Sequence, residues 1–134
     1  MAVTPNSIIT PQAVKTAQAV CTAAKTTYND ATNIVALLTA GANGAVLYSL
    51  KAVPRATVTA TQLQLYRFNG STYSLIDLAT MAAYTMANTT SPTKTDFGYS
   101  ETVPLRIASG EQLMVGAAVA LAGGIVFDAQ YEDL

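Results

Sequence analysis

The stretch "QLMVGAAVALAGGIVFDAQYE" (Gln112–Glu132) decides the fold. It carries no charge before Asp128, so it is typical either of a membrane-spanning helix or of strands that line a core. A spanning helix needs about 20 apolar residues, and this uncharged run is shorter and closed by Glu111 and Asp128. Much of its bulk is alanine, and small side chains gain little from transfer into lipid. We therefore expect strands and no membrane span.

A two-residue alternation in hydrophobicity supports this interpretation. It places the following residues on one side of successive strands: Val103, Leu105 and Ile107; then Leu113, Val115, Ala117, Val119 and Leu121; then Ile125, Phe127, Ala129 and Tyr131. The polar residues of the last strand, Asp128, Gln130 and Glu132, share the opposite parity. A helix would not preserve this pattern.

The turn between the last two strands sets their expected register. A three-residue turn at Ala122–Gly124 places Val119 opposite Phe127 and Val115 opposite Tyr131, whereas a two-residue turn would place Val119 opposite Asp128. Burial favours the three-residue turn. An alternative stays open, in which the two strands lie in opposite sheets and share inward faces without pairing.

The rest of the chain shows short apolar segments separated by turn signals. Asn69-Gly70 is a strong hairpin signal, and a two-residue turn there would pair Leu63 with Ile76 and Tyr66 with Tyr73. We count about eight strands, which predicts an all-β fold. The expected architecture is a single jelly-roll-like antiparallel β-sandwich over residues 14–134, preceded by an extended N-terminal arm.

The arm covers residues 1–13 and is predicted from its prolines, which favour extended backbone. It contains Pro5, Pro11 and the apolar pair Ile8-Ile9, whose side chains need an apolar surface to pack against. Two segments remain open at this point. The Ala/Thr-rich segment 14–27 is strand or, less favourably, helix, and residues 78–90 are strand or helix.

Composition limits the classes of function. With 11% charged residues and 51% hydrophobic ones, a lone monomer would struggle to cover its surface, so part of that surface is expected to meet other proteins. Seven Lys and Arg against eight Asp and Glu, without a basic cluster, predict no nucleic-acid or lipid partner. Cys21 is the only cysteine and is expected to be a small buried residue. The N-terminus lacks the pattern of a secretory signal.

The residues that catalysis requires are scarce. The chain has no histidine, so the commonest general base and metal ligand is missing. We found no phosphate-binding loop, dinucleotide fingerprint or zinc motif. Asp96 and Glu101 share a loop in which Ca²⁺ is conceivable, but a solvated loop is the preferred interpretation. We therefore predict a protein that is not an enzyme and has no cofactor or metal.

Aromatic and arm residues are the candidate contacts instead. Tyrosine suits interfaces because its ring is apolar and its hydroxyl is polar. Aromatics in the long loop 87–101 either pin it to the body or touch a partner. The candidate interface residues are Pro5, Ile8, Ile9, Pro11, Tyr66, Tyr73, Tyr84, Phe97 and Tyr99.

Two long runs give the chain a resemblance to a known family. The runs are "GANGAVLYSLKAVPRATVTATQLQLYRFNGSTYSLIDLA" and "DFGYSETVPLRIASGEQLMVGAAVALAGGIVFDAQYEDL". They resemble small capsid decoration, or cement, proteins of tailed bacteriophages, and the similarity extends from about residue 20 to the end. Its most recognisable parts are the strand–"NG"–strand unit and "PLRIASGEQLMV".

The resemblance implies a role as well as a fold. It implies a jelly-roll-like sandwich that self-associates as a dimer or trimer and binds the major capsid protein on the outside of an icosahedral head. The expected location is therefore the virion, after synthesis in the host cytoplasm. It transfers no functional residue, because such proteins bind through surfaces. The alternatives are a carbohydrate-binding virion module, a head–tail connector or tail component, and a small glycosidase with a close carboxylate pair.

Overall fold

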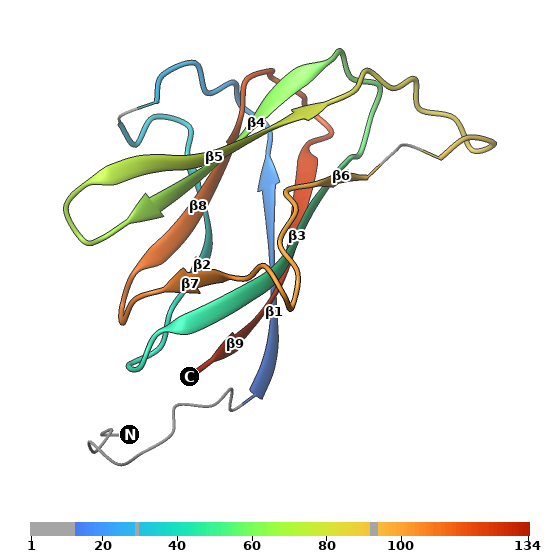
Figure 1. The fold of residues 1–134 in the computed structure, drawn as a ribbon. Coiled ribbons are helices and arrows are strands. Elements are labelled where there is room, and N and C mark those ends of the chain that lie inside the picture. The colour runs from blue at the N-terminus through green and yellow to red at the C-terminus, as the bar shows by residue number, and fades with distance from the viewer. Residues whose placement is uncertain (1–12, 29, 92–93) are drawn as a thin grey trace.

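The computed structural model describes residues 13–28, 30–91 and 94–134 and contains two antiparallel sheets (Figure 1). One sheet has the order β1-β9-β3-β6, with β7 also paired to β3, and the other has the order β2-β8-β4-β5. The strands are β1 (Ala13–Cys21), β2 (Val35–Thr39), β3 (Ala45–Pro54), β4 (Thr61–Phe68), β5 (Tyr73–Met81), β6 (Thr95–Asp96), β7 (Leu105–Ile107), β8 (Gln112–Ala117) and β9 (Ile125–Asp133). The predicted all-β sandwich is confirmed. The described residues form nine strands rather than about eight, and two of the nine, β6 and β7, have only two and three residues.

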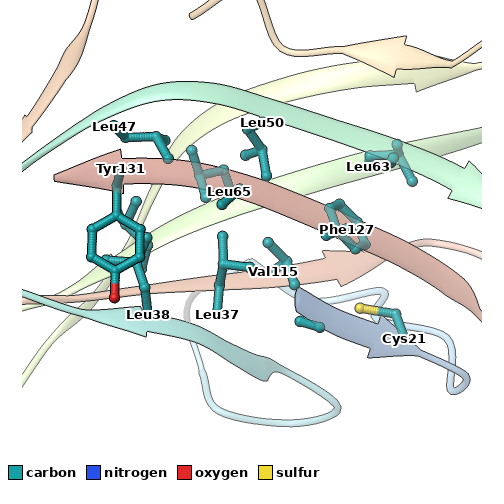
Figure 2. Close-up of a cluster of buried hydrophobic side chains, with 14 of the residues drawn as sticks. Cys21, Leu37, Leu38, Leu47, Leu50, Leu63, Leu65, Val115, Phe127 and Tyr131 are labelled. Carbon is teal, nitrogen blue, oxygen red and sulfur yellow. The ribbon is translucent and has the colours of Figure 1, made fainter. Parts of the chain in front are cut away.

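The core lies between the two sheets and follows the predicted alternation (Figure 2). In β8 the side chains of Leu113, Val115 and Ala117 have no exposed surface. In β9 the fully buried residues are Ile125, Phe127 and Ala129, and Tyr131 is 9% exposed. Val119 and Leu121 follow β8 and pack against the core from outside the strand. Val103 departs from the pattern, since it precedes β7 and is 61% exposed.

The predicted pairing of β8 with β9 is wrong, although their inward faces were predicted correctly. β8 pairs with β2 and β4, whereas β9 pairs with β1 and β3 in the other sheet. The corner turns at Gly124, whose N–H donates to the Leu121 carbonyl at 2.9 Å and whose φ is +85°. A left-handed residue here suits glycine. The chain thus crosses between sheets at this corner, which is the alternative that had been left open.

The predicted register of the β4–β5 hairpin is also wrong. Phe68 pairs with Tyr73 and Tyr66 pairs with Leu75, because the loop contains four residues, Asn69–Thr72. The Asn69 carboxamide oxygen accepts hydrogen bonds from the N–H groups of Ser71 (3.0 Å) and Thr72 (2.9 Å), which holds both residues in the turn. A β-bulge then leaves Ile76 without a partner on β4, so that Leu63 pairs with Ala79.

The open segments are settled where the structure describes them. β1 is a strand from Ala13, one residue before the predicted domain boundary. β5 ends at Met81 and no helix follows it in residues 82–90. No helix of the described residues is long and apolar enough to cross a membrane. Pro5, Ile8, Ile9 and Pro11 lie outside the described residues, as does almost all of the predicted arm.

Candidate docking surface

Tyr66 is not a surface residue, contrary to the prediction that it contributes to an interface. Its side chain has no exposed area. The hydroxyl lies 2.8 Å from the Gln64 carboxamide oxygen and 3.3 Å from the Thr27 carbonyl. Burial is the main cause that raises the pKa of Tyr66 to about 12. Tyr66 therefore stays neutral and acts as an internal hydrogen-bond donor.

The chain that follows β1 (residues 22–28) lies against Tyr66 and is held there by the buried Lys25. Lys25 is 1% exposed, and its ammonium donates to the Asp30 carbonyl (3.0 Å), the Asp30 carboxylate (3.2 Å) and the Thr32 carbonyl (2.9 Å). The ammonium also lies 5.2 Å from the centroid of the Tyr66 ring. The fully buried Gln64 amide donates to the Lys25 carbonyl at 3.1 Å. The buried polar groups of Lys25, Gln64 and Tyr66 thus find partners within the chain, as stability requires.

Gly116 makes room for this cluster on β8. A Cβ at this position would lie 2.9 Å from both the Lys25 Cδ and the Gln64 Oε1. The pKa of the Asp30 carboxyl is lowered by hydrogen bonds. The bond from Thr27 has the largest effect, and those from Thr32 and Lys25 come next. The carboxylate therefore remains charged beside the Lys25 ammonium. We interpret this cluster as a structural fastening, since all three ammonium protons are engaged within the chain.

Phe97 and Tyr99 pin their loop to the sandwich. The Phe97 ring packs 6.3 Å from that of Phe127, and its N–H donates to the Leu50 carbonyl at 3.0 Å. The Tyr99 hydroxyl donates to the Asp77 carboxylate at 2.8 Å. Burial is the main cause that raises the pKa of Tyr99 above its usual range, and the hydrogen bond to Asp77 and the charge of its carboxylate raise the pKa further. Of the two roles expected for these aromatics, the structure supports pinning to the body.

Tyr73 contributes to an apolar surface on the β4–β5 hairpin. Its ring stacks on Phe68 with centroids 4.3 Å apart, and both side chains are half-buried. Further along β5, Ile76 is 38% exposed and Leu78 is 45% exposed, with half-buried Leu75 between them and Tyr73. Residues 75–78 line an open depression in the surface. We call these five residues, Phe68, Tyr73, Leu75, Ile76 and Leu78, the hairpin patch.

The hairpin patch is uncharged at its exposed positions and lies on a projecting element. β5 alternates half-buried and exposed residues up to Thr80, and its exposed residues are Ser74, Ile76, Leu78 and Thr80. Its only charged residue, Asp77, is half-buried and bonded to Tyr99. The hairpin extends to the left of the molecule in Figure 1. Such a surface can bury apolar area against a partner with little desolvation of charge.

Tyr84 is remote from this patch. It forms an isolated bridge with Val58 before β4 begins, whereas Tyr73 pairs with Phe68 at the end of β4. Its hydroxyl donates to the Thr90 carbonyl at 2.9 Å. Tyr66, Tyr73 and Tyr84 therefore do not gather in one concave surface.

Several acidic residues and the cysteine occupy structural positions. Asp128 accepts from Gln18 at 2.7 Å, Asp133 pairs with Lys15, and Asp96 accepts from the N–H of Gly98 at 2.9 Å. No group of three or more His, Cys, Asp or Glu in the described part of the chain could hold a metal ion. Cys21 is 1% exposed, which confirms its predicted burial, and desolvation raises its pKa to about 12. Such a thiol is a poor nucleophile.

Two features were missed from the sequence. The Lys25–Gln64–Tyr66 cluster gave no local signal, because its members come from segments separated by about 40 residues of chain. The hairpin patch, in contrast, did leave a local signal in the sequence. Two adjacent apolar residues, Leu75-Ile76, interrupt the alternation of β5 at the site of the bulge. Comparisons with known proteins add no relative, since no protein-family model, curated protein or solved structure matches the chain.

Proposed function

We propose that this chain is a non-enzymatic virion structural protein that binds the outside of a tailed-phage head and stabilises contacts between major capsid proteins. The hairpin patch is the observation that carries the proposal, because it offers an exposed apolar surface for a protein partner. The resemblance of the sequence to decoration proteins supports the identity of that partner. Self-association as a dimer or trimer belongs to the same proposal.

The strand order supports the finer assignment of a jelly roll. The pairs are nested along the chain: β1 with β9, β2 with β8, β3 with β6 and β7, and β4 with β5. A ribbon of nested antiparallel pairs that is rolled over itself produces two sheets of this kind, and jelly rolls are double-sheet folds built in this way. We infer that the sandwich is a jelly roll.

The proposed mechanism is stabilisation by selective binding. A protein that binds the assembled lattice and not its dissociated subunits shifts the equilibrium toward the lattice by mass action. At a free concentration of 100 times the dissociation constant, the gain is about 2.7 kcal/mol per site. A patch of five side chains is small, so an oligomer that engages several sites would bind much more tightly than one subunit.

Co-sedimentation with heads that lack the protein tests the proposed surface. We expect Leu78→Lys to reduce the bound fraction at least tenfold, because it places a charge within the hairpin patch. Val103→Lys is the matched control: it introduces the same side chain at an exposed apolar position outside the patch. It should bind as the unmodified protein does. Both variants should unfold at the same denaturant concentration as the unmodified protein, since both positions are exposed.

The same measurement can overturn the proposal. If Leu78→Lys remains folded and binds heads as well as Val103→Lys does, the hairpin patch is not the contact surface. If the unmodified protein does not bind heads at any concentration, the head-binding role itself is wrong. The distribution of the tyrosines over separate sites gives no support to a carbohydrate-binding role.

A further inference from the structure

The four edges of the two sheets differ in how they are protected from pairing with another chain. Exposed edges offer free N–H and C=O groups, and proteins protect them by shortness, bulges or inward-pointing charges. β6 has two residues and β7 has three. β2 has five residues and is interrupted by a bulge. β5 is long, but it carries both a bulge at Ile76 and the half-buried Asp77.

The β1 edge is neither short nor bulged, and the one charged residue on its core-facing side, Lys15, is 48% exposed and paired with Asp133. β1 pairs with β9 over nine consecutive residues without a register shift, and within the described residues it pairs with no other strand. It contains no proline or glycine. Its single charged residue, Lys15, forms a salt bridge with Asp133 of β9, so its charge is compensated within the subunit. Among the edges in the described part of the chain, only β1 is both long and regular.

β1 also carries the most exposed large apolar residue in the described chain. Val14 is 74% exposed, and the first four residues of β1 are exposed on both faces. Val14 shares the outer face of the sheet with Thr16, Gln18 and Val20, since alternate residues point to the same side. The opposite face carries Ala19 and Cys21 into the core. A partner strand beside β1 would cover Val14 and satisfy the free backbone groups together.

We propose that β1 pairs in antiparallel fashion with β1 of a second copy of this chain, centred on Ala17. This register aligns all nine residues of the strand. It places Val14 opposite Val20 of the second copy and Thr16 opposite Gln18 of the second copy, while Lys15 lies opposite an alanine. No like charges face each other, and apolar residues meet apolar ones, which favours the pairing. The two five-stranded sheets then form one continuous sheet across a two-fold axis.

The pairing does not depend on the proposed head-binding role, and the two can fail separately. Because the contact is a single strand pair, its area is small relative to a standard interface. We therefore expect a dissociation constant on the order of 1–100 µM. An isologous contact of this kind closes at two subunits. The structure thus assigns the first interface of self-association to a specific strand.

Charge variants at the paired positions test the register. In the proposed dimer Thr16 faces Gln18 twice, so Thr16→Lys with Gln18→Lys places cations opposite each other across the interface. Thr16→Glu with Gln18→Lys places opposite charges there instead. In both variants the lysine at position 18 lies beside Asp128, with which Gln18 already bonds, so the subunit itself should tolerate the change.

The readout is molar mass by analytical ultracentrifugation of the purified full-length protein from about 1 to 300 µM, which brackets the expected dissociation constant. We expect the mass of the unmodified protein to rise from 13.9 kDa toward twice that value. The double-lysine variant should stay monomeric and the opposite-charge variant should dimerise. A monomer at all concentrations, a trimer, or a double-lysine variant that still dimerises would overturn the proposal.

Two further variants locate the contact. Ala17→Cys places two thiols across the two-fold axis at a Cα separation of about 4.5–5.5 Å, which suits a disulfide. Mild oxidation should crosslink this variant, while the unmodified protein should not crosslink because Cys21 is buried. Deletion of residues 1–11 tests another occupant. If the full chain is monomeric and the shortened chain is dimeric, the chain's own N-terminus covers the edge and the proposal fails.

Discussion

Lys25 shows how a single residue can determine which part of a sheet is exposed. The parity of β4 places Gln64 and Tyr66 on the outer face, away from Leu63 and Leu65 in the core. They are nevertheless fully buried, because Lys25 and Thr27, from the chain that follows β1, lie against them. A lysine can fill such a site because its long apolar stem packs while its ammonium finds oxygen partners.

Lys25 variants separate these two contributions. Lys25→Met keeps a stem of similar length and loses the three hydrogen bonds, and we expect it to lower the free energy of unfolding by about 1–3 kcal/mol. Lys25→Ala also loses the packing of the stem and should cost about 1–2 kcal/mol more. Equilibrium denaturation in urea measures both. A Lys25→Met variant as stable as the unmodified protein would show that the hydrogen bonds contribute nothing.

Among the elements, the inward faces could be predicted from sequence and the pairing partners could not. The alternation from Leu113 to Tyr131 is a local property, and it gave the core-facing residues of β8 and β9 correctly, although Met114 and Gly116 on the other face of β8 are buried as well. Which sheet a strand joins depends on contacts distant in the sequence, so the predicted β8–β9 pairing failed.

The exposure of a side chain was harder to predict than the face of the sheet on which it lies. The outward direction of Tyr66 followed from parity, but the segment that covers it could not be seen in the sequence, so its assignment to an interface was wrong. Phe97 and Tyr99 were expected either to pin a loop or to touch a partner; the structure shows the contacts that pin the loop, and a contact with a partner stays a prediction. Of the predicted contacts, Tyr73 alone lies in the hairpin patch.

The hairpin loop gives a prediction at the scale of an element. Asn69→Ala removes the oxygen that accepts from the N–H groups of Ser71 and Thr72, and we expect a loss of about 0.5–1.5 kcal/mol of stability. Ser71→Ala is the comparison variant, since it removes the hydroxyl that also donates to the Asn69 oxygen (3.2 Å) but keeps both N–H groups. It should change stability by less than about 0.5 kcal/mol. Equal effects of the two substitutions in thermal unfolding would contradict the assigned turn.

At the scale of the whole molecule, the candidate contacts lie on different elements. The hairpin patch belongs to the four-stranded sheet and the β1 edge to the five-stranded sheet. A dimer through β1 would therefore leave both hairpin patches free to bind, and two linked sites raise avidity. The predicted N-terminal arm is a third candidate contact, since its apolar pair Ile8-Ile9 needs an apolar surface to pack against.

The arm has its own test. We expect a chain without residues 1–11 to fold as the intact chain does, because β1 begins at Ala13. We also expect it to be lost from heads on washing. Retention equal to that of the intact chain, measured in the same co-sedimentation assay, would show that the arm makes no contact with the capsid.

Cryo-electron microscopy of virions with and without this protein tests the proposed role most directly. We predict additional density on the outer surface of the head, repeated with the symmetry of the capsid lattice, with the β4–β5 hairpin turned toward the major capsid protein. Density confined to a single vertex or to the tail, or identical maps of the two samples, would contradict the proposal that the protein binds and stabilises the head.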